Sequence, residues 1–327
     1  MRIVIPNDWN DAFAASPLVA ELRKRGEVSV HKGPSAEQEA ALAAAEVVVG
    51  IRERTWFLAD RIAKMPNLKL IAQIGGTDNP HIDVPVATQR GVLVCHTTGL
   101  APASSVPKDA LNTMAELAIG MMIAAQRQFA EQDRVLKAGG WPDVTGKTMA
   151  GKTLGIVGLG RIGGDIARAG RLFGMRVVAA GKTLTPERAA AAGVEYADLP
   201  GLFEASDIVS VSLKSTPATW GLVSRDLIWR MKPGALLVNT ARGPVLDDGA
   251  LVDALVQQRI YAALDVYNEE PLPADHPLRT SDRVLLLGHC GWATEEAYEH
   301  MIPSIATVVN AYLDGKPINM VNPDAQG

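Results

Sequence analysis

Residues 153–163, which read TLGIVGLGRIG, decide the fold of this chain. An apolar run typical of a buried strand leads into Gly158 and Gly160, which allow a sharp turn and a close approach of the backbone to a diphosphate. Gly163 allows the following helix to pack tightly on the strand, and the start of that helix presents N–H groups to phosphate. A second strand-like run, 175–180, follows the helix. This context predicts a dinucleotide-binding turn rather than an unrelated structural glycine turn.

The composition is that of an ordinary globular chain. With 327 residues, of which 47% are hydrophobic and 21% charged, the chain is long enough for two domains that each bury a core. A net charge of −4 without a run of Lys or Arg does not support a nucleic-acid partner. The two cysteines lie far apart and the six histidines are scattered, so we expect neither a disulfide framework nor a metal site.

Two features bear on cellular location. No segment approaches the roughly 20 uninterrupted apolar residues that a membrane helix needs. The opening residues, MRIVIP, predict a strand and not a secretory signal peptide. We therefore expect a cytoplasmic protein without a membrane partner.

Short apolar runs alternate with helical patterns along the chain. In the first hundred residues the strand-like runs are 2–5, 28–31, 47–50, 68–72 and 92–95. After the glycine motif the further runs are 208–211, 235–238, 262–264 and 284–287. Such alternation predicts parallel sheets that helices cover on both faces. The expected fold class is α/β, with two doubly wound parallel-sheet domains, one flavodoxin-like and one of Rossmann type, and a cleft between them.

The domain boundaries follow from the connecting segments. A loop-like stretch around residue 103 precedes a helical pattern from 110 to 137, and the last helical pattern, 294–313, is expected to return to the first domain. Small and apolar residues surround most of the 110–137 helix, which indicates burial between domains or in a dimer. The expected domains are 1–103 plus 295–327, and 104–294.

Polar side chains directly follow three of the predicted strands. Arg242 follows one strand within NTARG, in a position to hold a carboxylate bidentately and to polarise a neighbouring carbonyl group. His289 follows another, and a histidine beside a carboxylate is a general acid that works near neutral pH. Asp265 and Glu270 follow the third, within DVYNEEP. Taken singly, Arg242 is also compatible with a surface ion pair and His289 with a structural histidine.

The first domain offers a possible anion site. Gly75 and Gly76 follow the strand 68–72 and can present consecutive N–H groups to a carboxylate, although an ordinary glycine turn explains them equally well. Arg52 follows the strand 47–50 and can reach the same region, or it can be solvated.

Together these motifs resemble the D-isomer-specific 2-hydroxyacid dehydrogenases over nearly the whole chain. The likeness rests on the segments 158–163, 239–243, 265–271 and 289–296. The sequence RERT at 52–55 is similar to the glyoxylate/hydroxypyruvate reductase-like branch. The resemblance implies an NAD(P)-dependent oxidoreductase that transfers a hydride between NAD(P)H and a small 2-keto acid or D-2-hydroxy acid.

The resemblance also implies roles for individual residues. His289 would donate a proton to the keto oxygen, Glu270 would orient His289, and Arg242 would bind the substrate carboxylate and carbonyl. The residues implied in cofactor binding are Gly158, Leu159, Gly160, Arg161, Ile162, Gly181, Lys182, Thr183, Thr240, Ala241 and Asp265. Those implied in substrate binding are Arg52, Ile74, Gly75, Gly76, Arg242 and Trp292.

The choice of cofactor departs from the pattern of NAD-dependent relatives. Where those proteins carry an acid that bonds the ribose 2′-OH, the strand 175–180 ends in Gly181, Lys182 and Thr183. A lysine and a hydroxyl can bind a 2′-phosphate, so NADP is favoured, with NAD as the alternative.

We expect a homodimer acting on a small-molecule substrate. One alternative function is a phosphoglycerate-type dehydrogenase. The other is a nicotinamide-sensing scaffold similar to the corepressors that share this fold. The complete set Arg242, Glu270 and His289 favours an enzyme, because a sensor has less need of all three.

Overall fold

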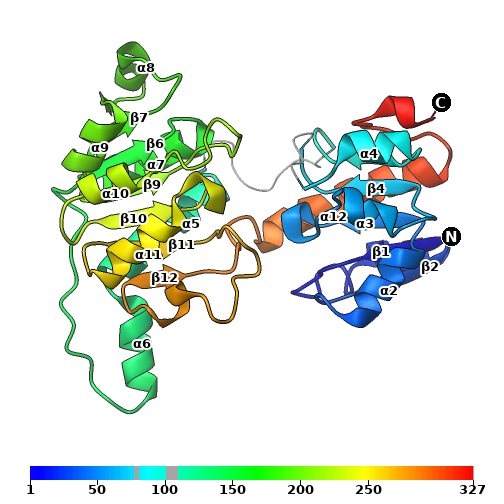
Figure 1. Cartoon of the computed structure of the whole chain (residues 1–327), viewed down its shortest axis with the longest axis horizontal. Coiled ribbons are helices and arrows are strands. Elements are labelled where there is room, and N and C mark those ends of the chain that lie inside the picture. The colour runs from blue at the N-terminus through cyan, green and yellow to red at the C-terminus, as the bar shows by residue number, and fades with distance from the viewer. Residues whose placement is uncertain (77–80, 101–109, 327) are drawn as a thin grey trace. The chain divides into compact units, whose positions relative to one another are not determined.

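The computed structural model describes residues 1–76, 81–100 and 110–326 (Figure 1). The chain forms two compact units, Met1–Lys108 with Thr294–Gly327 (unit 1), and Asp109–Ala293 (unit 2). The crossing expected near residue 103 lies outside the described residues. Each unit is a parallel sheet with helices, so the predicted α/β fold class is confirmed.

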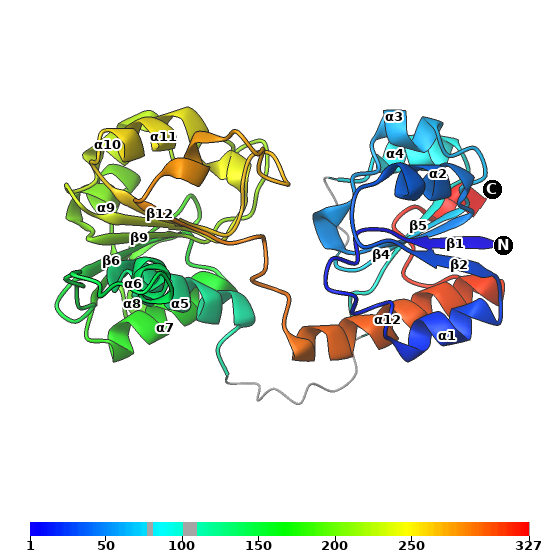
Figure 2. The ribbon, with the colours of Figure 1, turned by 90° about the horizontal axis from the view of Figure 1, so that it is seen from below.

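Unit 1 is built on a five-stranded parallel sheet with the order β2-β1-β3-β4-β5. Its strands are β1 (Arg2–Ile5), β2 (Glu27–Val30), β3 (Val47–Gly50), β4 (Leu70–Gln73) and β5 (Leu93–His96). Its helices are α1 (Pro17–Arg23), α2 (Ala36–Ala44), α3 (Ala59–Ala63), α4 (Val84–Gln89) and α12 (Glu295–Leu313), with short 3-10 turns at Arg52–Arg54 and Pro323–Gln326. Helices α1 and α12 cover one face and α2, α3 and α4 the other (Figure 2). This strand order is that of flavodoxin-like folds.

Unit 2 contains a seven-stranded parallel sheet with the order β12-β11-β10-β9-β6-β7-β8. Its strands are β6 (Thr153–Val157), β7 (Arg176–Ala180), β8 (Glu195–Tyr196), β9 (Ile208–Val211), β10 (Leu236–Asn239), β11 (Tyr261–Leu264) and β12 (Val284–Leu286). The first strand of this unit, β6, pairs with β7 on one side and with β9 on the other. The strand order therefore reverses between β6 and β9, as in dinucleotide-binding sheets.

Helices cover both faces of this second sheet (Figure 2). They are α5 (Thr113–Gln126), α6 (Phe129–Lys137), α7 (Arg161–Leu172), α8 (Pro186–Ala191), α9 (Leu199–Ala205), α10 (Arg225–Arg230) and α11 (Asp248–Val256), with 3-10 turns at Gly243–Val245 and Pro277–Thr280. Apolar residues of α5, α7 and α8 form one core, and those of α9, α10 and α11 form another. None of the helices in the described part of the chain combines the length and hydropathy of a membrane span.

The predicted strands are confirmed to within one or two residues, but one strand was missed and one helix prediction was wrong. The strand β8 was not predicted, because it has two residues, both exposed, and therefore no apolar run. The single helix expected over 110–137 is two helices, because Gln128 adopts a left-handed conformation with φ 53° and interrupts the helical hydrogen bonds. Helix α5 is buried against α7, β10 and β11, whereas α6 has no buried residue.

The glycine turn between β6 and α7 is a point of very close packing. Gly158 has φ 99°, which favours glycine, and a Cβ on Gly163 would lie 2.1 Å from the carbonyl oxygen of Gly158. A Cβ on Gly160 or Gly164 would meet nothing within 4 Å. The sequence therefore uses glycine here for a conformation, for helix packing and for an open approach to the backbone, as predicted.

Alanine variants at Gly163 and Gly164 distinguish the cost of a steric clash from the gain in helix propensity. We expect Gly163→Ala to destabilise the protein by about 1–3 kcal/mol, because the new methyl group meets backbone atoms that cannot move aside. The matched control Gly164→Ala is expected to stabilise by up to about 1 kcal/mol, since its methyl group meets open space within the same helix. Urea unfolding measures both; equal stability of the two variants would contradict the contact.

Candidate active site

The amino end of α7 is arranged to receive a phosphate group. Gly160 is exposed and is the N-cap, and among the described residues no side chain caps the helix, which leaves its first N–H groups without a capping side chain there. Leu159 and Ile162 are half-buried and Arg161 is exposed. The open space at Gly160 and the positive end of a helix of 12 residues fit a dinucleotide diphosphate.

The end of β7 carries positive charge. Lys182 and Thr183 are exposed, and the backbone turns after Gly181, whose carbonyl accepts the N–H of Leu184 at 3.1 Å. The guanidinium group of Arg188 donates to the carbonyl of Thr183 and so folds back over this turn. Glu187 is the first carboxylate after β7 along the chain, and the hydroxyl of Thr185 lowers its pKa. Lys182 and Arg188 therefore bring two cations to the turn that follows this strand.

The turn after β10 is formed by its own side chains. The Asn239 amide donates to the carbonyl of Arg242 at 3.1 Å, and its side-chain oxygen accepts the N–H of Ala241 at 3.0 Å. This holds Thr240 and Ala241 in buried positions and leaves Arg242 half-buried. The Arg242 guanidinium donates to the carbonyl of Ala241 at 2.6 Å. The role of Asn239 in shaping this turn was not predicted, although the residue stands within the quoted motif.

His289 and Glu270 form a close pair. Nδ1 of His289 lies 2.6 Å from Oε2 of Glu270, with 15% of the histidine and 26% of the glutamate side chain exposed. The other carboxylate oxygen of Glu270 accepts the backbone N–H of Tyr267 at 2.9 Å. Because Nδ1 faces the carboxylate, Nε2 is the ring nitrogen that remains for proton exchange. His289 itself has φ 53°, an uncommon conformation for a residue other than glycine.

Asp265 ties the segment after β11 to the segment after β12. Its carboxylate is fully buried and accepts the backbone N–H groups of Cys290 at 2.8 Å and Gly291 at 3.1 Å. Burial, together with the charge of Asp265, raises the pKa of the Cys290 thiol to about 11, so this thiol is neutral near neutral pH and is a poor nucleophile.

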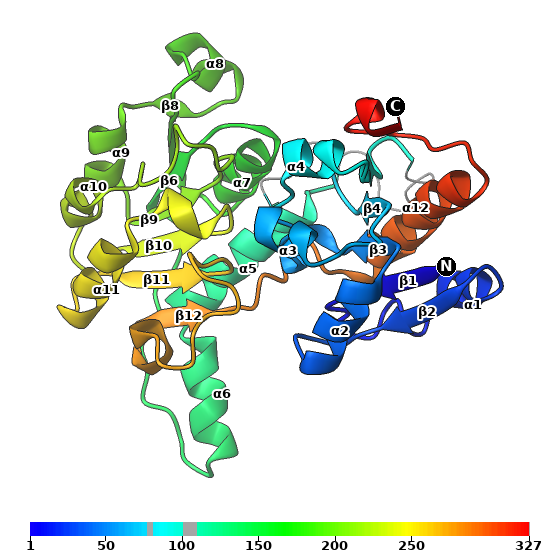
Figure 3. The same cartoon turned by 45° about the vertical axis from the view of Figure 1, so that its right-hand side comes forward.

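The three predicted motifs therefore meet at one edge of the sheet in unit 2 (Figure 3). A Cβ on Gly243 would lie 2.0 Å from backbone atoms of Tyr267, so the turn after β10 touches the segment after β11. A Cβ on Gly291 would lie 2.6 Å from the side chain of Met114 and 2.9 Å from that of Leu117, both on α5. Trp292, next to it, is buried with 8% exposed.

The residues predicted in unit 1 also gather at the carboxyl ends of strands. A guanidinium nitrogen of Arg52 lies 3.9 Å from the position of a Cβ on Gly75, and Arg52 Nε lies 3.6 Å from the carboxylate of Glu53. Gly75, one of the two predicted N–H donors, donates to Thr97 at 3.0 Å within the unit, and the N–H of Ile74 donates to Gly50 at 2.9 Å. The N–H of Gly76 donates to no acceptor in the described ranges.

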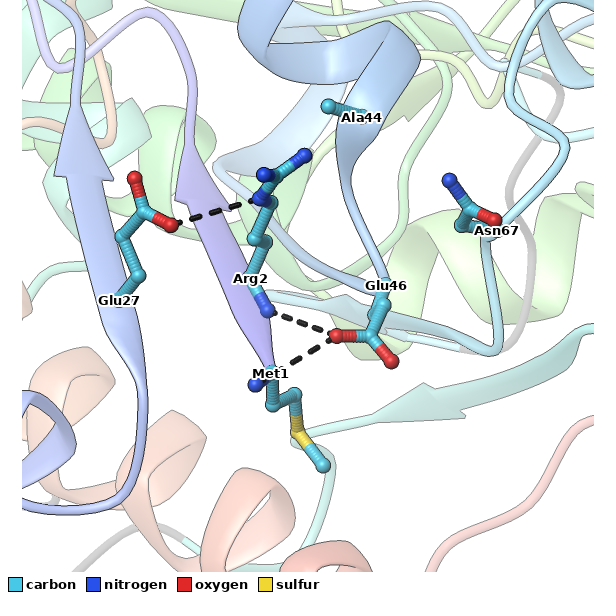
Figure 4. Close-up of a pocket in the computed structure, with 6 residues that line it drawn as sticks. All are labelled: Met1, Arg2, Glu27, Ala44, Glu46 and Asn67. Atoms are coloured by element: carbon cyan, nitrogen blue, oxygen red, sulfur yellow. Dashed lines mark hydrogen bonds and ion pairs between the residues drawn. The ribbon is translucent and has the colours of Figure 1, made fainter.

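A surface pocket of about 290 Å³ lies at the other edge of this sheet, where the strands begin (Figure 4). Its charged groups bind each other: the N–H of Arg2 donates to Glu46 at 2.9 Å, and the Arg2 guanidinium lies 3.4 Å from Glu27. Within unit 1, this pocket lies at the edge of the sheet opposite to Arg52, Gly75 and Gly76. Among the residues that the structure describes, no group of three or more His, Cys, Asp or Glu is placed to hold a metal ion.

Comparison with known proteins identifies relatives over most of the chain. The family model for the D-isomer specific 2-hydroxyacid dehydrogenase, NAD binding domain, matches residues 119–291. A glyoxylate reductase of Thermofilum pendens is 38% identical over 79% of this chain and 76% of its own length. A D-3-phosphoglycerate dehydrogenase of Mycobacterium leprae is 37% identical over 92% of this chain, which spans 56% of that relative. The crystal structure of a phosphoglycerate oxidoreductase from Vibrio cholerae superposes with a TM-score of 0.85 at 33% identity, covering 96% of this chain and 99% of that one.

The fold and these matches define a nicotinamide-dependent oxidoreductase. The chain belongs to the D-isomer specific 2-hydroxyacid dehydrogenase family. The predicted family and the predicted enzyme class, a 2-hydroxyacid dehydrogenase, are thereby confirmed.

Proposed function

We propose that this enzyme reduces glyoxylate, hydroxypyruvate or a similarly small 2-keto acid to the D-2-hydroxy acid, with NADPH as the reductant. The observation that carries the chemistry is the His289–Glu270 pair, 2.6 Å apart, at the edge of the dinucleotide-binding sheet. The substrate class is supported by the glyoxylate reductase of T. pendens, which this chain matches over about three quarters of both lengths. Oxidation of phosphoglycerate is the second candidate, supported by the M. leprae and V. cholerae relatives.

In the proposed reaction, residues of unit 2 supply binding and proton transfer. The glycine turn and the start of α7 bind the diphosphate, with Leu159, Arg161 and Ile162 beside it. Thr240, Ala241 and Asp265 directly follow strands β10 and β11 and would contact the nicotinamide. When bound, NAD(P)H would supply the hydride that C2 of the keto acid accepts, and Nε2 of His289 would donate the proton that converts the keto oxygen to a hydroxyl. Glu270 accepts the hydrogen bond from Nδ1–H of His289 and so holds the ring in the orientation that leaves Nε2 for the substrate.

The remaining proposed contacts hold the substrate carboxylate. Arg242 is suited to a bidentate contact and to polarising the keto group. We assign unit 1 as the substrate-binding domain, in which Arg52 and the N–H of Gly76 are the anion-binding groups and Ile74 and Gly75 shape the turn. Trp292 is assigned as a wall of the substrate pocket, and unit 2 as the dinucleotide-binding domain.

Single variants of His289 and Glu270, with a control at Glu269, test the catalytic assignment. We expect His289→Gln to lower kcat about 100-fold or more, since it removes the proton donor, while NADPH binding persists. Glu270→Gln is expected to lower kcat, and Glu269→Gln, its neighbour, to leave it unchanged. Initial rates with glyoxylate, hydroxypyruvate, pyruvate and phosphohydroxypyruvate measure this. A wild-type protein that binds NADPH but turns over none of them would instead support the nicotinamide-sensing scaffold.

The preference for NADPH rests on the turn after β7. Lys182 and Arg188 bring positive charge there, and Gly181 and Thr183 complete the turn without a carboxylate at the strand end. We expect Lys182→Ala to weaken NADPH binding about tenfold, because it removes a charge-assisted bond to the 2′-phosphate, and to leave NADH binding unchanged. Lys182→Arg should retain NADPH binding. Fluorescence titration measures each dissociation constant; equal affinity of the wild type for NADH and NADPH would refute the assignment.

A second copy of this chain is the partner that we propose for the exposed side of α6. Phe129 and Leu136 on α6 and Trp141 just beyond it are 50%, 49% and 88% exposed. Figure 3 shows this helix extending away from the sheet of unit 2. An exposed apolar surface of this kind is typical of protein interfaces.

The cytoplasmic location stays a prediction, supported by two cysteines that are both free.

Charged substitutions test the dimer. Trp141→Lys with Phe129→Lys is expected to weaken self-association about 30-fold or more, because apolar anchors dominate such interfaces. The control Trp220→Lys alters another exposed tryptophan, 59% accessible, outside this surface. Light scattering over a range of concentrations measures the association state. A monomeric wild type, or dissociation by the control alone, would exclude α6 as the interface.

A further inference from the structure

Tyr267 connects the ends of two neighbouring strands. Its phenol oxygen lies 2.6 Å from the carbonyl oxygen of Leu287 and 3.2 Å from that of Leu264. Leu264 is the last residue of β11, and Leu287 directly follows β12. The N–H of Leu287 also donates to Leu264 at 2.8 Å. The phenol therefore forms a side-chain hydrogen bond beside the backbone hydrogen bond that joins Leu287 to Leu264. Leu287 lies two residues before His289.

The backbone of Tyr267 holds the other member of the pair. Its N–H donates to Oε1 of Glu270 at 2.9 Å, while Oε2 of the same carboxylate bonds His289 at 2.6 Å. Tyr267 thus binds the Glu270 carboxylate through its backbone N–H, and through its phenol it binds Leu287, in the segment that precedes His289. Because the two contacts use different atoms, a substitution can remove one and leave the other.

The segment around His289 needs such anchoring. At φ 53° its backbone lies in the left-handed region, which costs free energy for a residue with a side chain and persists only when its surroundings hold it. Asp265 binds the two N–H groups that follow, those of Cys290 and Gly291. On the preceding side, the bond from the Tyr267 phenol to Leu287 is the side-chain contact that fixes the chain.

The phenol is suited to a permanent donor role. Burial, and then the negative charge of Asp265, raise the pKa of Tyr267 well above its ordinary value. The hydroxyl therefore stays protonated near neutral pH and can donate its one proton to a carbonyl oxygen. Its contacts go to backbone carbonyls, so it acts through His289 rather than on the substrate.

We propose that Tyr267 is a positioning residue for the His289–Glu270 pair, because its phenol fixes the end of β12 that carries the histidine. The inference rests on the proposed proton-donor role of His289. Without the phenol bond, the loop 287–291 keeps the Asp265 contacts and the backbone bond from Leu287 to Leu264, but it loses the side-chain bond that holds the Leu287 carbonyl. The histidine ring then spends less time in the orientation that both Glu270 and the keto oxygen require.

The test is Tyr267→Phe, which removes only the phenol oxygen and retains the ring and the backbone N–H. Its control is Tyr261→Phe, the same change at the first residue of β11, where the ring contacts the side chains of Lys147 and Arg283. We expect Tyr267→Phe to lower kcat about fivefold, the effect of one neutral hydrogen bond, with KM for the keto acid and Kd for NADPH within about twofold of the wild type. The control should leave all three unchanged.

A second readout does not depend on turnover. The Nδ1 proton of His289 bonded to Glu270 is expected as a downfield proton resonance that is absent from His289→Gln. Tyr267→Phe should weaken or broaden this resonance, and Tyr261→Phe should not. An unchanged kcat together with an unchanged resonance would overturn the proposal, even if the thermal midpoint falls, since that result describes a purely structural contact. If the wild type turns over no keto acid, the proposed function fails, and the resonance alone decides whether Tyr267 positions His289.

Discussion

Parallel pairing of the strands in unit 2 is the constraint on which the candidate site depends. All strands of a parallel sheet end at the same edge, so residues that directly follow them become neighbours although the chain separates them. The register pairs Asn239 with Leu264, and Leu264 with Leu286. Arg242, Asp265 and His289 therefore leave the sheet side by side. A slip of one residue in any of these strands would turn the side chains to the opposite face.

Hydrogen bonds between the loops then fix the positions of side chains that the sheet places only approximately. The carboxylate of Asp265 holds two N–H groups beyond His289, and the Tyr267 phenol holds the chain before it. Glu270 binds both the imidazole ring and the Tyr267 backbone. A buried carboxylate must be satisfied by donors, and here the donors belong to the loop that carries the proposed acid. Stability of the fold and orientation of the histidine thus use the same hydrogen bonds.

Much of this architecture was predictable because its signals are local. Strand positions follow from apolar runs, since a parallel strand buried on both faces has few polar residues. The glycine turn follows from spacing, because each glycine meets a separate steric demand. The departures have equally physical causes. Gln128 interrupts a continuous helical pattern through its left-handed backbone, and β8 is too short and exposed to leave an apolar run.

The sequence by itself determined the two α/β units, the glycine turn of the dinucleotide site and the residue types of the proposed chemistry, because these depend on periodicity and on steric limits between near neighbours. Only the tertiary structure decided which groups are already engaged. The N–H of Gly75 is bound by Thr97, Arg188 folds over the turn that contains Lys182, and the Tyr267 phenol reaches Leu287. Such bonds join atoms that are distant in sequence or that meet only after the backbone has turned, and their geometry comes from packing rather than from local pattern.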